Sequence, residues 1–246
     1  MRAVGRVILL FAIVLSAAVL SGCKTSSLIS ESQEIEIGRQ ASLDIERKYH
    51  VVNDPALNQR INHIGQTIAA RSARANIAYT FKILDLKDVN AVSLPGGWVY
   101  LYKGLINECK DDDDMLAGVI AHEIGHVAAR HHASIMGRET LYGIGIQVLV
   151  KGNLQQWVAV WANLDLLRWS RSDENEADRL AINYTYGSPW KPDGLIRFLK
   201  ILQTKSKGDG GIFGPMLRTH PLTKERIERA EKYLQELERT GGKTSG

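Results

Sequence analysis

A chain of 246 residues is long enough for one globular domain, or for one domain with a small appendage. Its apolar fraction of 44% and charged fraction of 24% are ordinary for a globular protein. The formal charge of +4 is modest and no basic stripe interleaved with aromatic residues occurs, so composition argues against a nucleic-acid partner.

The first 22 residues predict a lipoprotein signal peptide. Arg2 and Arg6 make its start positive, and the apolar run Val7–Leu20 is too short for a comfortable membrane span. The run ends in Leu20-Ser21-Gly22-Cys23, which resembles the bacterial lipobox, where the signal is cut before a cysteine that carries lipid. The alternative is an ordinary signal peptide whose cleavage region includes Cys23.

Lipid on Cys23 would hold the mature protein on a membrane while the domain stays in water. Residues 23–32 comprise this cysteine and a Ser-rich tether. By resemblance to Gram-negative lipoproteins, Lys24 favours the outer membrane, facing the periplasm, over the inner membrane. The domain is expected over residues 33–240, followed by a disordered tail at 241–246.

Two helices and a small sheet are predicted in the first half of the domain. Asn53-Asp54-Pro55 is a helix start signal, and apolar residues alternate with period two from Ile77, which indicates a strand. Cys109 has no second cysteine in the domain and is expected to be a buried core residue. The expected helices lie at 34–49 and 55–73, and the strands of an antiparallel sheet at 77–86, 89–94 and 98–102.

A strongly apolar helix is predicted from Met115 to about His132, after the four carboxylates Asp111–Asp114. Negative charge is favourable at a helix N-terminus, which explains the carboxylates. An EF-hand calcium site is not favoured, because its spaced ligands and glycine are missing.

This helix contains the motif H-E-x-x-H at residues 122–126. Residues four apart share a helix face, so His122 and His126 can bind one zinc ion, and Glu123 can reach a water molecule at the metal. A peptidase needs these roles, because the metal lowers the pKa of the water to about 7 and a carboxylate takes its proton. A chance match to a short pattern is the alternative.

Further helices are expected after the motif. The apolar stretches 141–150 and 157–167 are interrupted by polar residues, which favours two amphipathic helices on the core or over the cleft and not a membrane hairpin. Ser170 to Asp173 fits a capping box for a helix that Gly187-Ser188-Pro189 ends. Other helices are expected from 192 and over 222–237, with a mobile glycine-rich segment at 206–214.

Two histidines do not complete a catalytic zinc site, which takes three protein ligands and leaves one position for water. The third ligand should be a His, Asp or Glu on another element. His131 and His132 follow His126 closely, and their angle on the helix predicts that both lie on the surface. His50 and His63 lie in early helices and are interpreted as ordinary polar residues.

Several ordered motifs resemble the HtpX and CAAX-prenyl-protease family of zinc metallopeptidases, and within it the soluble periplasmic branch. They are the H-E-x-x-H motif, then Ser170-Arg171-x-x-Glu174-x-Glu176-Ala177-Asp178, then His220-Pro221 with Arg226. The stretch 89–100 also resembles that branch, and the likeness covers roughly residues 34–239.

The resemblance implies one Zn²⁺ per chain with Glu174 as the third ligand. Asp178 lies one helical turn further and would orient a ligand histidine, while Glu176 points elsewhere. His220 and Arg226 match positions near the cleft. His220 could contact the metal site or regulate access to it, and Arg226 could hold substrate or the oxyanion. A His-Pro pair is also a plausible helix cap.

In that family the strand near residues 90–94 borders the cleft. Such an edge can accept an extended peptide as an added strand, with little demand on its sequence. The resemblance therefore marks Asn90, Ala91, Val92 and Ser93 as a substrate-binding edge. A fully paired strand is the alternative.

Together these features predict a mostly helical α+β zincin, gluzincin-like, with a small antiparallel sheet beside the active-site helix. The expected activity is a zinc-dependent endopeptidase that degrades misfolded or misassembled envelope proteins. One alternative is a chaperone or assembly factor for outer-membrane proteins, in which zinc is structural or proteolysis is secondary or latent. The outer-membrane assembly machinery would then be a partner. Another is a latent enzyme, whose His220 segment or 141–169 region plugs the cleft.

Overall fold

The computed structural model describes residues 29–141, 155–164, 167–205 and 211–242. The predicted signal peptide, Cys23 and most of the tether lie outside the described residues, as do most of the apolar stretch 141–150 and the end of the tail. Within the described ranges, no helix has both the length and the apolar character needed to cross a membrane.

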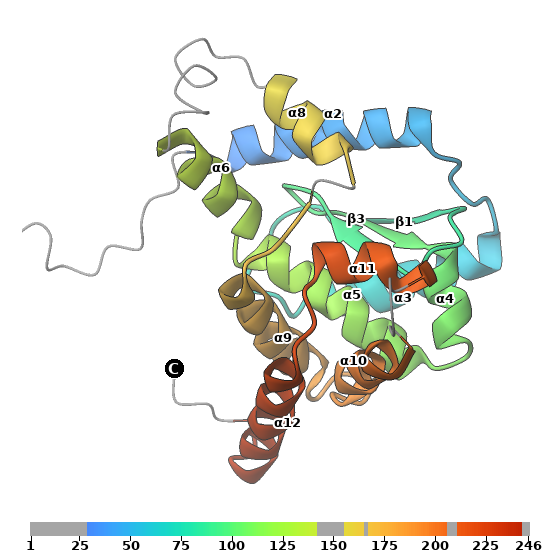
Figure 1. Cartoon of the computed structure of the whole chain (residues 1–246), viewed down its shortest axis with the longest axis vertical. Coiled ribbons are helices and arrows are strands. Elements are labelled where there is room, and N and C mark those ends of the chain that lie inside the picture. The colour runs from blue at the N-terminus through green and yellow to red at the C-terminus, as the bar shows by residue number, and fades with distance from the viewer. Residues whose placement is uncertain (1–28, 142–154, 165–166, 206–210, 243–246) are drawn as a thin grey trace, which may run out of the picture.

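Helices dominate the described chain, and three short strands form one sheet, which confirms a mostly helical α+β fold (Figure 1). The first half contains α2 (Glu31–Lys48), α3 (Pro55–Ala69), β1 (Thr80–Leu84), β2 (Ala91–Ser93), β3 (Trp98–Tyr102), α4 (Lys103–Cys109) and α5 (Asp113–Ala128). The second half contains α6 (His131–Leu141), α8 (Gln155–Ala162), α9 (Arg171–Thr185), α10 (Gly194–Lys205), the 3₁₀ turn η1 (Gly211–Phe213), α11 (Gly214–Thr219) and α12 (Lys224–Arg239).

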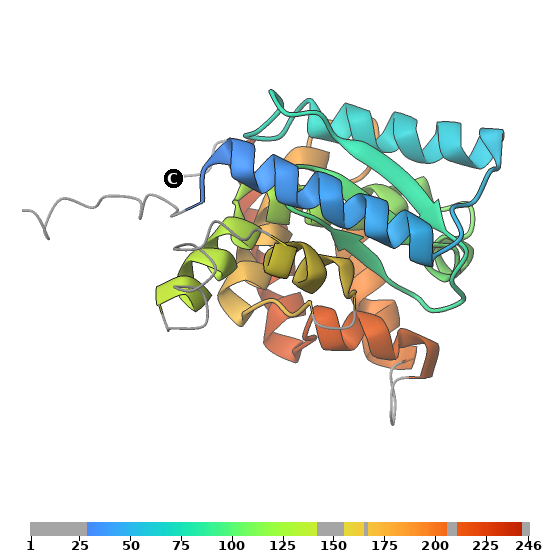
Figure 2. The ribbon, with the colours of Figure 1, turned by 90° about the horizontal axis from the view of Figure 1, so that it is seen from above.

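Helices cover both faces of the sheet. Figures 1 and 2 show α2 and α8 on one face, and α3 and α5 on the other. On β3, Val99 and Leu101 join the core of α3 and α5, whereas Tyr100 and Tyr102 join the core of α2 and α8. This alternation explains why the strand is apolar or aromatic at every position.

The sheet is mixed, so the prediction of an antiparallel sheet was wrong for one strand pair. The strand order is β1-β3-β2: β2 pairs antiparallel with β3, but β1 pairs parallel with it, from Thr80 opposite Trp98 to Leu84 opposite Tyr102. The chain reverses direction between successive strands. Because the third strand inserts between the first two, it runs in the same direction as the first.

The motif helix α5 lies at the centre of the protein, and its residues 115–127 are buried. Asp112 caps it by accepting a hydrogen bond of 3.0 Å from the backbone N–H of Met115, in line with the predicted helix start. A methyl group on Gly118 would come within 2.3 Å of the backbone nitrogen of Leu195. Glycine therefore lets α10 approach α5 at backbone distance.

The motif helix ends at Ala128, earlier than the predicted end near His132. Arg130 adopts a left-handed conformation with φ of 57°, and a second helix, α6, begins at His131. The Arg130 guanidinium donates hydrogen bonds to Glu34 (2.9 Å) and to the Ile29 carbonyl (2.8 Å), both near the start of the described chain. These contacts hold the break in place.

Other predictions in the second half had mixed outcomes. The capping box at Ser170 is present, with Asp173 as its second member. Cys109 is 1% exposed, and burial raises the pKa of its thiol to about 12, as expected of a core residue. By contrast, η1 and α11 occupy residues 211–219, where the sequence predicted no helix.

Candidate metal centre

The H-E-x-x-H motif is completely buried. The exposed fractions of His122, Glu123 and His126 are 3%, 0% and 0%. The Nε2 atoms of His122 and His126 lie 3.1 Å apart, so the two histidines share a helix face as the i, i+4 spacing predicts.

Helix α9 crosses α5 closely and brings Glu174 to this face. A methyl group on Gly125 would lie 3.0 Å from the Ala177 carbonyl oxygen, so two small residues allow the two backbones to approach. The capping box at Ser170 fixes where α9 starts, one turn before Glu174. Glu174 is 1% exposed, and its Oε1 lies 3.4 Å from Nε2 of His126.

Four side chains converge here, each with one potential ligand atom, and these atoms all lie within 4.8 Å of one another: His122, His126, Glu174 and His220. Nδ1 of His220 is 2.9 Å from Oε1 of Glu174 and 3.2 Å from Nε2 of His122. Ligands at zinc–nitrogen distances of about 2.0–2.1 Å lie about 3.3 Å apart at the corners of a tetrahedron. The observed spacings are near that value, so these residues fit a zinc ion.

The pKa shifts of His126 and Glu174 also suit a metal, which requires deprotonated ligands. Burial lowers the pKa of His126 well below its usual value, which keeps the ring neutral. Burial alone would raise the pKa of Glu174, but the charges of Arg226 and His220 and the hydrogen bonds from His126 and His220 outweigh it and hold this pKa well below its usual value. Glu174 is therefore a carboxylate.

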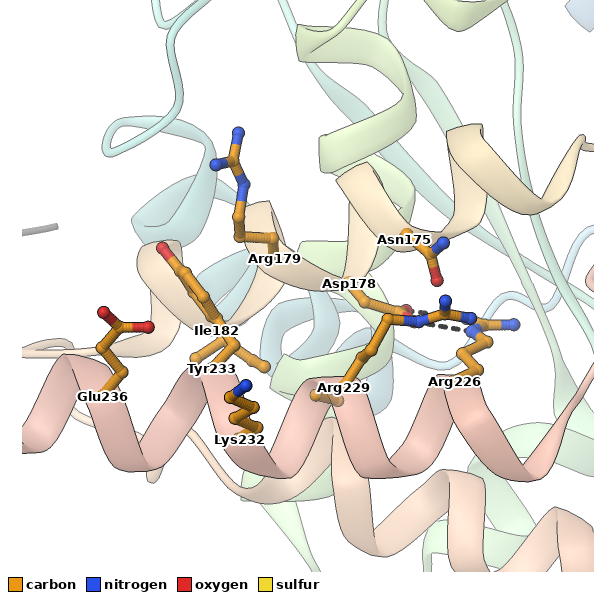
Figure 3. Close-up of a pocket in the computed structure, with 10 residues that line it drawn as sticks. Asn175, Asp178, Arg179, Ile182, Arg226, Arg229, Lys232, Tyr233 and Glu236 are labelled. Carbon is orange, nitrogen blue, oxygen red and sulfur yellow. Dashed lines mark hydrogen bonds and ion pairs between the residues drawn. The ribbon is translucent and has the colours of Figure 1, made fainter. Parts of the chain in front are cut away.

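Asp178 and Arg226 form a buried pair behind the group, shown in Figure 3 beside a cavity of about 270 Å³ between α9 and α12. Arg226 donates two hydrogen bonds to the Asp178 carboxylate, of 2.6 and 2.7 Å. Oδ1 of Asp178 lies 2.9 Å from Nδ1 of His122, at hydrogen-bonding distance although not at a hydrogen-bonding angle. The structure thus places Asp178 where it can orient a ligand histidine.

Arg226 also contacts Glu174 through Nη1, and the residue is only 4% exposed. Burial would lower its pKa, but the charges of Asp178 and Glu174 raise it above the usual range, so Arg226 stays a cation. Its guanidinium is engaged by two carboxylates. This geometry favours electrostatic support of the site over the contact with substrate or oxyanion that the resemblance implied.

Glu123 has an unusual environment. Neither of its carboxylate oxygens has a hydrogen-bond partner in the part of the chain that the structure describes, although the side chain is completely buried. The nearest ion-pair contact is Nε2 of His220, at 3.4 Å from Oε1. A buried carboxylate without hydrogen bonds is costly, so its position beside the histidines makes it a candidate reactive group.

The site is covered in this structure. His220, at the end of α11, is 3% exposed and lies against Glu174 and His122. The Trp169 ring stacks on His126 with 4.1 Å between ring centroids, and its backbone N–H donates to the Thr219 carbonyl at 3.1 Å. Two segments far apart in the sequence therefore close over the metal-ligand group.

His131 and His132 are buried, so the prediction that both lie on the surface was wrong. On one continuous helix His131 would point about 140° away from His126. The break at Arg130 instead turns the His131 ring back, and its Nδ1 lies 2.9 Å from Nδ1 of His126. His132 points to the sheet, with Nε2 at 2.9 Å from the Ser93 carbonyl. Sequence reasoning missed both, because no sequence pattern marks this break.

The predicted substrate edge is an edge strand, but it is covered. β2 lies at one end of the strand order, and residues 90–93 are buried. Besides the His132 contact to Ser93, Thr219 Oγ1 lies 3.4 Å from Oδ1 of Asn90, and the Val89 N–H donates to the Ile212 carbonyl at 2.8 Å. The 211–220 segment thus lies where an added peptide strand would approach.

Comparison with known proteins identifies relatives of the whole domain. The profile of peptidase family M48 matches residues 55–234, more than half of the chain. The beta-barrel assembly-enhancing protease of Escherichia coli (strain K12) is 26% identical over 229 residues, which cover 88% of this chain and 47% of that protein. The metalloprotease YcaL of the same organism is 26% identical over 251 residues, which cover 89% and 94% respectively.

A eukaryotic relative matches as well. The mitochondrial metalloendopeptidase OMA1 of Schizosaccharomyces pombe is 27% identical over 186 residues, which cover 72% of this chain and 53% of that protein. The chain spans about half the length of the beta-barrel assembly-enhancing proteases that it matches. What the remainder of those proteins does therefore does not carry over to this chain.

Proposed function

The chain belongs to peptidase family M48, and we propose that it is a zinc-dependent endopeptidase of the bacterial envelope. His122, His126 and Glu174 would hold the zinc ion. Zinc bound there would act as a Lewis acid that polarises the scissile carbonyl and lowers the pKa of a bound water molecule.

The chain's own residues then carry the proton transfers. Glu123 takes a proton from the attacking water and passes it to the leaving amine. Asp178 lies behind the His122 ring, 2.9 Å from its Nδ1, where it would orient the ring, and Arg226 keeps Asp178 and Glu174 ionised. His220 and Arg226 are therefore not required as proton carriers in this scheme.

One observation carries the proposal: the buried Glu123 carboxylate, without a hydrogen-bond partner among the described residues, stands next to a four-residue ligand group. A purely structural zinc site has no use for such a carboxylate. Stability alone would favour an apolar residue at this position, since a buried polar group without a hydrogen bond is destabilising.

The proposal predicts metal-dependent cleavage of an unfolded protein. The purified chain should hold about one zinc ion and cleave casein, lose activity in a strong chelator, and regain it when zinc is added back. Zinc content and the rate of fragment formation are measured on the same sample. Cleavage that survives complete removal of metal would contradict the proposal, and the rate with calcium added back serves as the control.

The envelope location and the substrates are inferred from the N-terminal sequence and from the relatives. The lipobox-like Leu20-Ser21-Gly22-Cys23 favours a lipid anchor, and Lys24 after it favours the outer membrane, facing the periplasm. These residues lie outside the described part of the chain. One group of relatives is named for enhancing beta-barrel assembly. We therefore propose misfolded or misassembled envelope proteins as substrates, bound as extended segments along β2.

A chaperone or assembly factor with secondary proteolysis remains the alternative from another class. The naming of the beta-barrel assembly-enhancing relatives supports it, because assembly and degradation act on the same unfolded substrates. Stoichiometric zinc without turnover of any unfolded protein would favour this alternative.

A latent form of the enzyme is supported by the closure of the site. His220 occupies the neighbourhood of the ligand atoms, and a fourth protein ligand would take the position that a catalytic zinc keeps for water. Trp169 and Thr219 connect the two covering segments. Both would have to move before a peptide could reach Glu123.

His220→Ala is therefore expected to raise the rate of casein cleavage while zinc stays bound by three ligands. The expected rise is about 5- to 150-fold, the change that a typical coupling free energy between two sites of a protein produces. His63→Ala, at an exposed position on α3, is the matched control and should leave the rate unchanged. A loss of activity with zinc retained would instead make His220 a catalytic residue.

A further inference from the structure

The second ligand histidine has a buried ring nitrogen that needs a partner. Nε2 of His126 faces the ligand group, at 3.1 Å from Nε2 of His122 and 3.4 Å from Oε1 of Glu174. If Nε2 carries the lone pair for a metal, Nδ1 must carry the proton. The residue is 0% exposed, so this N–H requires an acceptor within the protein.

His131 provides that acceptor. Its Nδ1 lies 2.9 Å from Nδ1 of His126, and the ring is 3% exposed. A neutral histidine that accepts at Nδ1 must donate at Nε2. Nε2 of His131 points to acidic groups on α9, at 3.4 Å from Oε2 of Glu176 and 4.0 Å from Oδ1 of Asp173. With a proton on Nδ1 of His126 and on Nε2 of His131, both rings therefore make hydrogen bonds.

The backbone is arranged to place this ring. Arg130 takes the left-handed conformation that ends α5, and its guanidinium is fixed by Glu34 and the Ile29 carbonyl. Glu34 is 0% exposed and also accepts a 2.9 Å hydrogen bond from Arg74. A left-handed arginine is held only where its surroundings determine it, and here the result is that the His131 ring folds back over His126.

We propose that His131 is a positioning residue of the metal centre, which orients His126 by accepting its Nδ1 proton and is itself anchored by a hydrogen bond to Glu176. The two ligand histidines then have separate supports: Asp178 with Arg226 behind His122, and His131 with the acidic groups of α9 behind His126. The inference rests on the proposed zinc site, and it assigns a function to the residue that follows the motif helix.

The test measures zinc affinity of the full chain by competition with a chromogenic chelator. His131→Leu removes the acceptor and should raise the Kd for zinc about 10- to 100-fold, the usual effect of losing such a support. His131→Asn keeps an oxygen or nitrogen near the position of Nδ1 and should recover most of the affinity. Glu176→Gln, at a half-exposed side chain, should raise the Kd less than His131→Leu does.

His132→Leu is the matched control. This histidine is adjacent and equally buried, but its Nε2 contacts the Ser93 carbonyl and not the ligand group, so zinc affinity should stay near that of the wild type. Wild-type affinity in His131→Leu, or equal losses in His131→Leu and His132→Leu, overturns the proposal. If His131→Leu does not fold, His131→Ala takes its place, because alanine also lacks an acceptor. A Kd for zinc in His131→Ala as low as in His131→Asn and the wild type then overturns the proposal. A wild-type chain that binds no zinc refutes the zinc site itself and is a separate outcome.

Discussion

Glu123→Gln should bind zinc normally and cleave unfolded protein at least about 10²- to 10⁴-fold more slowly than the wild type, the range for loss of a general base. The amide has nearly the same shape as the carboxylate but cannot accept the proton of the attacking water. The same change should not lower stability. The carboxylate has no hydrogen-bond partner among the described residues, and a neutral amide is less costly to bury than a charge.

Cleavage rate, zinc content and thermal midpoint are measured together for Glu123→Gln. Glu36→Gln is the matched control, since Glu36 is a partly exposed residue of α2, an element away from the site, and pairs with Arg39. It should retain wild-type cleavage. A Glu123→Gln variant that holds zinc and is active would show that Glu123 is not the base. One that has lost its zinc would show instead that Glu123 is needed for metal binding. Lost activity with unchanged or raised stability would show the usual conflict between function and stability at a reactive site.

Features set by local sequence were predicted well. The i, i+4 spacing of His122 and His126 and the apolar character around them gave a buried helix with both rings on one face. The capping box at Ser170 placed the start of α9, and the same helical periodicity put Glu174 and Asp178 on one face. In each case the signal lies within one or two turns of the residue concerned.

Features set by distant contacts were not predicted. The parallel pairing of β1 with β3 depends on which strand inserts between the others, which local periodicity does not encode. The break at Arg130 depends on Glu34, about a hundred residues earlier in the chain, so His131 and His132 were expected on the surface. Arg226 was recognised only through the family resemblance, and its partners Asp178 and Glu174 required the structure.

Arg226→Met should give the largest loss of stability at the site in the metal-free protein. The substitution keeps much of the side-chain volume but leaves Asp178 and Glu174 without their cation. Removing one partner of a buried ion pair costs about 3–5 kcal/mol. For a domain of this size that corresponds to a thermal midpoint lower by roughly 6–20 °C.

Zinc should restore part of that stability, so the rise in thermal midpoint on adding zinc should be larger in Arg226→Met than in the wild type. Two effects oppose each other here. Without Arg226, Asp178 supports His122 less well, which weakens zinc binding about 10- to 100-fold, or by about 1.4–2.7 kcal/mol. Zinc also neutralises the buried carboxylates that have lost their cation, which strengthens its binding by much of the roughly 3–5 kcal/mol. The second effect is larger.

Arg197→Met is the control. Arg197 also faces three carboxylates, but its side chain is 36% exposed, so the loss of stability should be at most about 1 kcal/mol. The rise in thermal midpoint on adding zinc should be the same as in the wild type. An Arg226→Met variant that is as stable as the wild type without metal, or that gains no more from zinc, would mean that the carboxylates do not depend on this cation.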